Sequence, residues 1–144
     1  MQLQALLGDY SLTFWGLWTI LFLILVQAIV ASVSHRKQKK YIPGIVDANL
    51  SHESMVFRSH RTHQNSLENI MIFFGPVVIA LLTGFDAQNL AIIVWVYAIA
   101  RIIHTVLYYT IATEKNPSPR SYFYIIALLA NIVLFVMLAM HLAR

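Results

Sequence analysis

Four long apolar segments, separated by shorter polar ones, constrain this chain more than any other feature. We place them at about residues 12–34, 53–83, 89–112 and 120–141. A helix rises about 1.5 Å per residue, so about 20 residues are enough to cross a hydrocarbon core of roughly 30 Å. Each segment reaches that length, and the sequence therefore predicts four transmembrane helices.

The composition agrees with an integral membrane protein. Hydrophobic residues make up 59% of the 144 residues, charged residues make up only 11%, and the mean hydropathy is +0.69. Soluble domains usually contain about 45–50% apolar and about 25% charged residues. The length suits a single domain, so we predict one all-α bundle of four transmembrane helices over residues 1–144.

The charge and the lack of cysteine exclude several classes of function. The net charge is +4, but the ten Lys and Arg residues cluster at the ends of the apolar segments, as they do in membrane proteins. We therefore do not expect binding to nucleic acid. The chain contains no cysteine, which excludes disulfides, a cysteine nucleophile and a cysteine-ligated metal.

The distribution of basic residues predicts the orientation in the membrane. Four crossings put both termini on one side, where Arg144 is the only basic residue, and put the first and third loops on the other side. Because basic loops remain in the cytoplasm, we predict that both termini lie outside and that these loops are cytoplasmic. The residues of the two loops that decide this are Arg36, Lys37, Lys39, Lys40 and Lys115.

Polar residues interrupt three of the segments near their predicted cytoplasmic ends. At about 100° per residue, those of the second helix share an arc of about 80°, and those of the third and fourth helices each share one face. Charges within a membrane rarely lack a function, so we expect these faces to turn together and form a site. The residues are Arg58, Arg61, Asn65 and Glu68, then Arg101, His104 and Tyr108, then Arg120, Ser121 and Tyr124.

The inventory of these faces indicates the kind of ligand. Arg binds carboxylates through two parallel hydrogen bonds, and Glu68 suits an ammonium group, so a small zwitterion with more than one carboxylate fits. The alternative is an internal ion-pair network of Glu68 with Arg61 or Arg101, although one acid cannot neutralise four arginines. Neighbouring arginines would repel a metal cation, and His63 lies too near the interface for a bis-histidine haem, so we expect neither.

Three motifs occur in the order in which one known membrane family has them. They are Phe57-Arg58-x-x-Arg61-x-His63-x-Asn65-x-Leu67-Glu68-Asn69, Ala100-Arg101-x-x-His104-Thr105-Val106-x-Tyr108, and Arg120-Ser121-x-x-Tyr124. They resemble the signatures of the second, third and fourth helices of the MAPEG family, the membrane-associated proteins in eicosanoid and glutathione metabolism. The first motif is more similar to that of microsomal glutathione transferases and prostaglandin E synthase than to that of the lipoxygenase-activating protein. Gln64 departs from the pattern, because some members have Arg there.

The resemblance implies a homotrimer that binds glutathione between neighbouring subunits near the cytoplasmic face. Glutathione carries two carboxylates and one ammonium group, which agrees with the ligand inferred from the residues. Arg36, at the end of the first helix, is a further candidate for a carboxylate contact, and Arg58 is counted with the ligand-binding residues. The other residues that the resemblance implies are Arg61, Asn65, Glu68, His104, Tyr108, Arg120, Ser121 and Tyr124.

The resemblance also implies the chemistry of a glutathione-dependent transferase or peroxidase in detoxification. Arg120 would stabilise the glutathione thiolate, the Ser121 hydroxyl would donate a hydrogen bond to it, and Tyr124 would donate a proton or orient the substrate. The thiolate would attack a lipophilic electrophile that arrives through the membrane lipid, or reduce a lipid hydroperoxide. Two alternatives remain open: a non-catalytic lipid- or ligand-binding scaffold on the same fold, and a haem-bearing membrane anchor.

Overall fold

The computed structural model describes residues 8–144, and these form four long helices. They are α2 (Ser11–His35), α3 (Met55–Leu82), α4 (Ala87–Thr110) and α5 (Pro119–Leu142). All four are long and apolar enough to cross a membrane. The predicted all-α fold of four membrane-spanning helices is therefore confirmed. The helix ends differ from the predicted ones by one or two residues.

Local capping explains where three of the helices begin. The Ser54 hydroxyl accepts a hydrogen bond from the Val56 N–H at 3.2 Å, so α3 starts after Ser54 and not at Glu53. The Asp86 carboxylate accepts from the Asn89 N–H at 2.8 Å and caps α4. At α5, Ser118 is the N-cap, followed by a proline at the first helical position, where the missing N–H has no cost.

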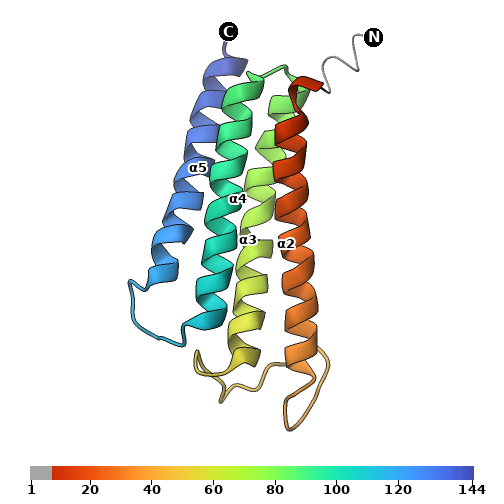
Figure 1. Cartoon of the computed structure of the whole chain (residues 1–144), viewed down its shortest axis with the longest axis vertical. Coiled ribbons are helices and arrows are strands. Elements are labelled where there is room, and N and C mark those ends of the chain that lie inside the picture. Colours follow the sequence, from red (N-terminus) through yellow and green to blue (C-terminus); the bar gives the residue numbers. More distant parts are fainter. Residues whose placement is uncertain (1–7) are drawn as a thin grey trace.

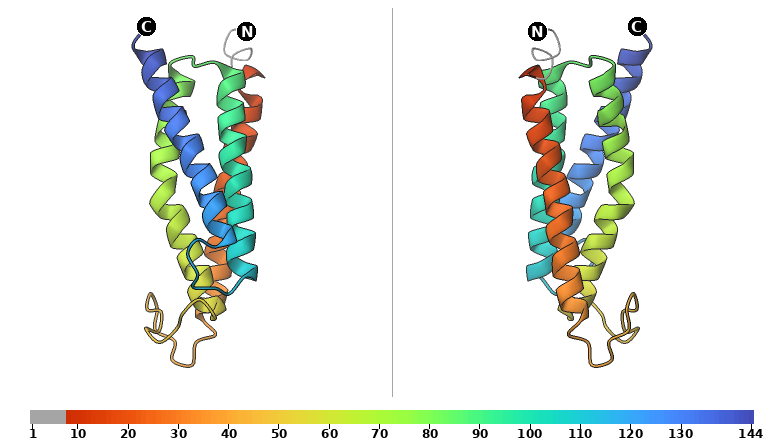
Figure 2. Two further views of the ribbon diagram at one scale, coloured as in Figure 1. Left: turned by 90° about the vertical axis from the view of Figure 1, so that its left-hand side faces the viewer. Right: turned by 90° about the vertical axis from the view of Figure 1, so that its right-hand side faces the viewer.

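The helices form an elongated bundle in which α4 packs against each of the other three (Figure 1). The start of α2, the turn between α3 and α4 and the C-terminus lie at one end, and the two longer connections lie at the other (Figures 1 and 2). We call the second end the loop end. It contains the loop of residues 36–54 and the loop of residues 111–118. The polar residues singled out from the sequence lie in the half of the bundle nearer to the loop end.

The apolar core occupies the half of the bundle away from the loops. Leu90, Val94 and Leu134 are fully buried, and the rings of Phe73 and Tyr97 stack with their centroids 3.7 Å apart. Pro76 lies within α3, which continues past it to Leu82. This half contains only scattered polar side chains, so its packing rests on apolar burial.

Candidate functional site

A buried polar cluster lies near the loop end, between the last turns of α4 and the first turns of α5. The Arg120 guanidinium carbon is 4.1 Å from the centroid of the Tyr108 ring, which is a cation–π distance. The His104 ring centroid is 5.6 Å from that of Tyr108 and 6.3 Å from that of Tyr124. The structure thus brings together four residues that the sequence placed on two separate helices.

Two polar atoms in this cluster have no hydrogen-bond partner among residues 8–144. The Arg120 Nη2 group donates to the Thr113 carbonyl at 3.1 Å, but Nη1 is buried and unpartnered. His104 is buried, with 3% relative exposure, and its Nδ1 atom is unpartnered too. A buried polar atom without a partner costs about 1–3 kcal/mol, so such atoms are expected where a ligand supplies the partner.

Ser121 is engaged in the start of α5. Its hydroxyl oxygen accepts a hydrogen bond from the Ser118 N–H at 3.1 Å and lies 3.2 Å from the Ser118 hydroxyl oxygen. This is the reciprocal arrangement of a capping box, which stabilises the first turn of a helix. The sequence motif had suggested only a ligand-binding role for this hydroxyl. Its hydrogen can still point to a ligand when Ser118 is the donor of the pair.

The α3 face that carries Arg61, Asn65 and Glu68 is partly open. Arg61 Nη1 lies 3.5 Å from Glu68 Oε1, and the two side chains are 41% and 55% exposed. An ion pair with this exposure contributes at most about 1 kcal/mol to stability. The Asn65 Oδ1 atom is buried without a partner. The face therefore holds one acid, one base and one free amide oxygen that a ligand could contact.

Arg58 lies on the same helix but serves the protein's own backbone. Its Nη1 group donates to the carbonyls of His52 and Glu53 at 2.7 and 2.9 Å. Its Nη2 group donates to the Tyr109 carbonyl at 3.3 Å. Arg58 thus joins the end of the first loop to the end of α4, and these donors are already occupied by carbonyl oxygens.

Arg101 lies about two helical turns deeper than Tyr108 and belongs to a different set of contacts. It is 3% exposed, and its Nη2 group donates to the Ser66 hydroxyl at 2.9 Å. The Thr105 hydroxyl donates to the Arg101 carbonyl at 2.8 Å and accepts from Gln27 Nε2 at 2.7 Å. These bonds connect α2, α3 and α4. In the described part of the chain Arg101 has no carboxylate partner, so the predicted ion-pair network does not include it.

His52 contributes to the cluster although the sequence gave no reason to select it. Its Nε2 atom is 3.2 Å from the Tyr108 hydroxyl, and its ring is stacked against the Tyr108 ring at 5.9 Å. Burial, and then the positive charge of Arg120, lower the pKa of His52 below its usual value. His52 lies in a loop, where helical periodicity carries no information about neighbours.

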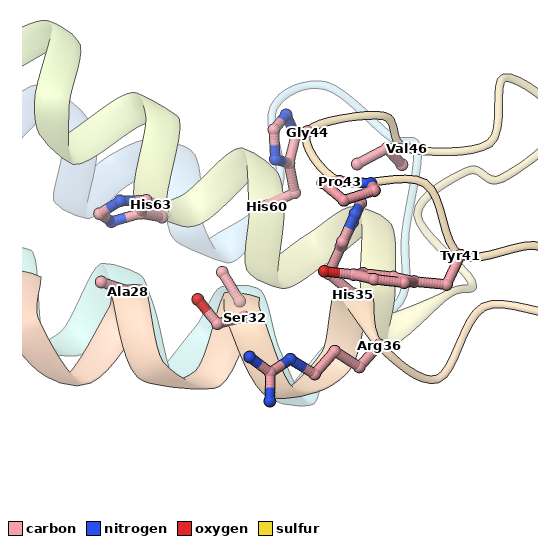
Figure 3. A pocket seen from close by; sticks show the side chains of 11 residues that line it. Ala28, Ser32, His35, Arg36, Tyr41, Pro43, Gly44, Val46, His60 and His63 are labelled. Atoms are coloured by element: carbon pink, nitrogen blue, oxygen red, sulfur yellow. The ribbon is translucent and has the colours of Figure 1, made fainter.

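Arg36 lies elsewhere in the same chain. It lines a cavity of about 320 Å³ between α2, α3 and the first loop, which also contains His60 and His63 (Figure 3). In Figure 3, Arg36 lies beside Ser32 on α2, and the two histidines reach the cavity from α3. None of the four clustered residues His104, Tyr108, Arg120 and Tyr124 is among the residues that line this cavity. Within residues 8–144, no group of three or more His, Cys, Asp or Glu is arranged to hold a metal ion.

Comparison with known proteins assigns the chain to a family. The model of the MAPEG family matches residues 12–140 of the 144 residues. No curated protein and no solved structure matches the chain. The matched range contains all four membrane-spanning helices except for residues at the outer ends, and it contains all the polar residues described above. The chain belongs to the MAPEG family, and so is an integral membrane protein related to those of glutathione or eicosanoid metabolism.

Proposed function

We propose that this protein is a glutathione-dependent membrane transferase or peroxidase. The observation that carries the proposal is the unpartnered, buried Arg120 Nη1 group beside Tyr108 and His104, in a chain of the MAPEG family. A buried cationic donor with no protein acceptor is suited to an anion, and a thiolate is the anion that this chemistry requires.

The remaining polar groups suit the rest of glutathione. Glu68 would bind its ammonium group, and Arg61 would bind one of its carboxylates, so that both leave their present ion pair. The free Asn65 oxygen would accept a hydrogen bond from an amide N–H of the ligand. Binding would replace a long, exposed ion pair with shorter charge-assisted hydrogen bonds. The exchange is favourable because the exposed pair itself contributes little.

The proposed chemistry begins with loss of the thiol proton. A thiol with a pKa of about 8.5 is mostly protonated at neutral pH, and lowering that pKa by two units requires about 2.7 kcal/mol of preferential thiolate stabilisation. One charge-assisted hydrogen bond from Arg120, aided by a Ser121 hydroxyl, is of the right size. Tyr124, near His104, would orient the substrate or return a proton to it.

The thiolate would then react in one of two ways. In transfer, sulfur forms a bond to an electrophilic carbon, and the leaving group departs with its electron pair or a ring opens. In peroxide reduction, sulfur forms a bond to the terminal oxygen of a lipid hydroperoxide and the O–O bond breaks, which gives a sulfenic acid and an alkoxide; the alkoxide takes up a proton, from Tyr124 or water, to become the alcohol. A second glutathione then converts the sulfenic acid to a disulfide and water. Both substrates are apolar enough to arrive through the bilayer.

We further propose that the protein works as a homotrimer with the site between subunits. Glu68 is the fourteenth of the 28 residues of α3, so the exposed Arg61–Glu68 pair lies well within a membrane-spanning helix. Lipid-exposed charges at that depth are costly, so a second copy would cover this face. That copy would also supply Arg36, which lies away from the cluster in its own chain. The loop end would face the cytoplasm.

A non-catalytic ligand-binding protein on the same fold is the second candidate. One observation favours it: the Ser121 hydroxyl, which the enzyme would use to stabilise the thiolate, is engaged in a helix cap. Such a protein would bind glutathione or a lipid without chemical turnover.

The test is to reconstitute the protein in lipid nanodiscs and to measure glutathione binding and conjugation to an activated, lipophilic aryl halide. We expect both, and we expect both to weaken in Arg61→Ala but not in Lys115→Ala, a loop control outside the site. Binding without conjugation to any of several electrophile classes, and without hydroperoxide reduction, would support the binding protein. Absence of glutathione binding would contradict the enzyme and would leave only a lipid-binding protein on this fold.

A further inference from the structure

Arg58 links the last residues of the first loop to the end of α4 through hydrogen bonds. Its two terminal nitrogens donate to the carbonyls of His52 and Glu53 in the loop and of Tyr109 in α4. A guanidinium that satisfies three main-chain carbonyls fixes their relative positions more firmly than a single neutral hydrogen bond would. This holds the His52 backbone in place over the loop end.

The His52 side chain is directed at Tyr108. The two rings are almost parallel, with an interplanar angle of 21°, and His52 Nε2 is 3.2 Å from the Tyr108 hydroxyl oxygen. The Phe57 ring also packs against the imidazole in an edge-to-face arrangement, with ring centroids 4.8 Å apart. The imidazole is therefore confined by an aromatic ring on α3 and a phenol on α4.

Tyr108 in turn supports the arginine to which we assign thiolate binding. Its ring lies 4.1 Å from the Arg120 guanidinium carbon, while Arg120 Nη2 is held by the Thr113 carbonyl. These two contacts leave Nη1 without an acceptor in the described part of the chain. The direction of Nη1 thus depends on where the Tyr108 ring lies, and the Tyr108 ring is held at its hydroxyl end by His52.

We propose that His52 is a positioning residue for the thiolate site: it holds the Tyr108 phenol, which holds the Arg120 guanidinium with Nη1 free for the ligand. The inference rests on the proposed function for its catalytic consequence, whereas the contacts themselves require no ligand. His52 does not touch the reacting sulfur, and its effect passes through Tyr108.

The electrostatic surroundings explain why a histidine serves here. The charged groups that act on His52 are Arg120 from α5, Arg58 and Arg61 from α3, and Glu114 from the second loop. Burial first, and then the cations among these groups, favour a neutral imidazole, whose Nε2 can accept the phenol O–H. A lysine or arginine at this position would repel Arg120 and weaken the contact that it is meant to support.

The test compares His52→Ala with His52→Gln, whose side chain can still hydrogen-bond the phenol. The readout is the pH midpoint at which bound glutathione ionises, followed by thiolate absorbance, together with the Kd of S-methyl glutathione, which has no ionisable thiol. We expect His52→Ala to lower the thiolate equilibrium constant about three- to tenfold, since one hydrogen bond of about 0.5–1.5 kcal/mol is lost. The Kd should change less than about twofold, and His52→Gln should recover most of the loss.

His141→Ala is the matched control, because His141 also joins two elements, through the Thr83 carbonyl at 3.0 Å, but does so at the opposite end of the bundle. Its thiolate midpoint should equal that of the wild type. A wild-type midpoint in His52→Ala would overturn the inference and leave the proposed function intact. A weaker Kd with an unchanged midpoint would also overturn it, because it would mean that His52 only shapes the loop.

A second measurement does not need glutathione chemistry. Fluorotyrosine placed at position 108 reports the ring environment by ¹⁹F resonance in the ligand-free protein. We expect the resonance to shift and broaden in His52→Ala and to return toward the wild-type position in His52→Gln. An unchanged resonance in His52→Ala would overturn the inference even if the wild-type protein formed no thiolate, which would itself count against the proposed function.

Discussion

Two buried polar clusters lie in the loop-end half of this bundle, and they differ in how many of their polar atoms have hydrogen-bond partners. In the deeper cluster, Gln27 donates to Thr105, Thr105 donates to the Arg101 carbonyl, and Arg101 donates to Ser66. In the cluster nearer to the loops, Arg120 Nη1 and His104 Nδ1 have no partner. The deeper cluster connects helices to one another, whereas the shallower one has donors and acceptors left for something else.

Whether a buried polar atom has a hydrogen-bond partner therefore helps to distinguish structural from functional polar residues within a membrane. A buried hydrogen bond between helices contributes to stability, while a buried group without a partner lowers it and needs another reason to be present. The contrast is not absolute, since Gln27 Oε1 in the deeper cluster is also unpartnered. It still makes the two clusters respond differently to substitution.

The largest effect is expected for Arg120→Ala. Removing the donor that stabilises a developing anion typically lowers turnover about 10²–10³-fold, and we expect glutathione conjugation in nanodiscs to fall by that amount. Thermal unfolding in detergent should change little, because within the described residues Arg120 makes one hydrogen bond, to Thr113, beside its cation–π contact with Tyr108. Turnover within about threefold of the wild type would show that the shallower cluster is not the catalytic one.

Ser66→Ala should have the opposite signature. It removes the hydroxyl that Arg101 Nη2 uses and leaves a buried guanidinium with fewer acceptors, so we expect the free energy of unfolding to fall by about 1–3 kcal/mol. The midpoint of thermal unfolding measures this. Glutathione turnover per folded molecule should stay within about twofold of the wild type. A selective loss of turnover would mean that the deeper cluster belongs to the site.

Glu68→Gln tests the partly open face of α3, and we expect an effect on ligand binding that is smaller than the effect of Arg120→Ala on turnover. The exposed Arg61–Glu68 pair contributes at most about 1 kcal/mol, so the free energy of unfolding should fall by no more than that amount. If Glu68 binds the ammonium group of glutathione, loss of its charge should weaken binding about tenfold, as calorimetry can measure. An unchanged Kd would remove Glu68 from the proposed site.

The smallest effect concerns pH. Because the folded protein lowers the pKa of His52 below 6.5, the detached loop binds a proton more readily than the attached one. The contribution of His52 is therefore complete above about pH 6.5 and is lost as the pH falls below it. Hydrogen exchange of residues 51–54, corrected for intrinsic rates, should show faster opening at about pH 5.5 than at about pH 7.5. His52→Gln should abolish this dependence, and a dependence that persists in that variant would belong to another group.

The sequence was sufficient to predict the helices and part of the site. Hydropathy fixes the four crossings because the bilayer demands about 20 apolar residues for each. Helical periodicity placed His104 and Tyr108 on one face, and the structure brings Arg120 and Tyr124 next to them. Periodicity could not separate Arg101 from these residues, because all three α4 side chains share that face and differ only in which neighbour they reach.

The sequence did not predict which hydrogen-bond partners the polar side chains find within the folded protein. Arg58 was grouped with the ligand-binding residues, but three main-chain carbonyls lie within its reach. The Ser121 hydroxyl was assigned to a ligand, but a helix cap also uses it. His52 approaches Tyr108 from a loop 56 residues away. Each outcome depends on distances between segments remote in sequence, which no local pattern encodes.

Stopped-flow ultraviolet absorbance can show whether Arg120 is the group that stabilises a glutathione thiolate. Detergent-purified wild type and Arg120→Ala are mixed with glutathione at neutral pH, with folding verified by circular dichroism. If Arg120 has this role, thiolate absorbance rises in the wild type and does not rise in Arg120→Ala. An equal rise in both proteins, or no rise in a folded wild type that binds glutathione, would contradict it.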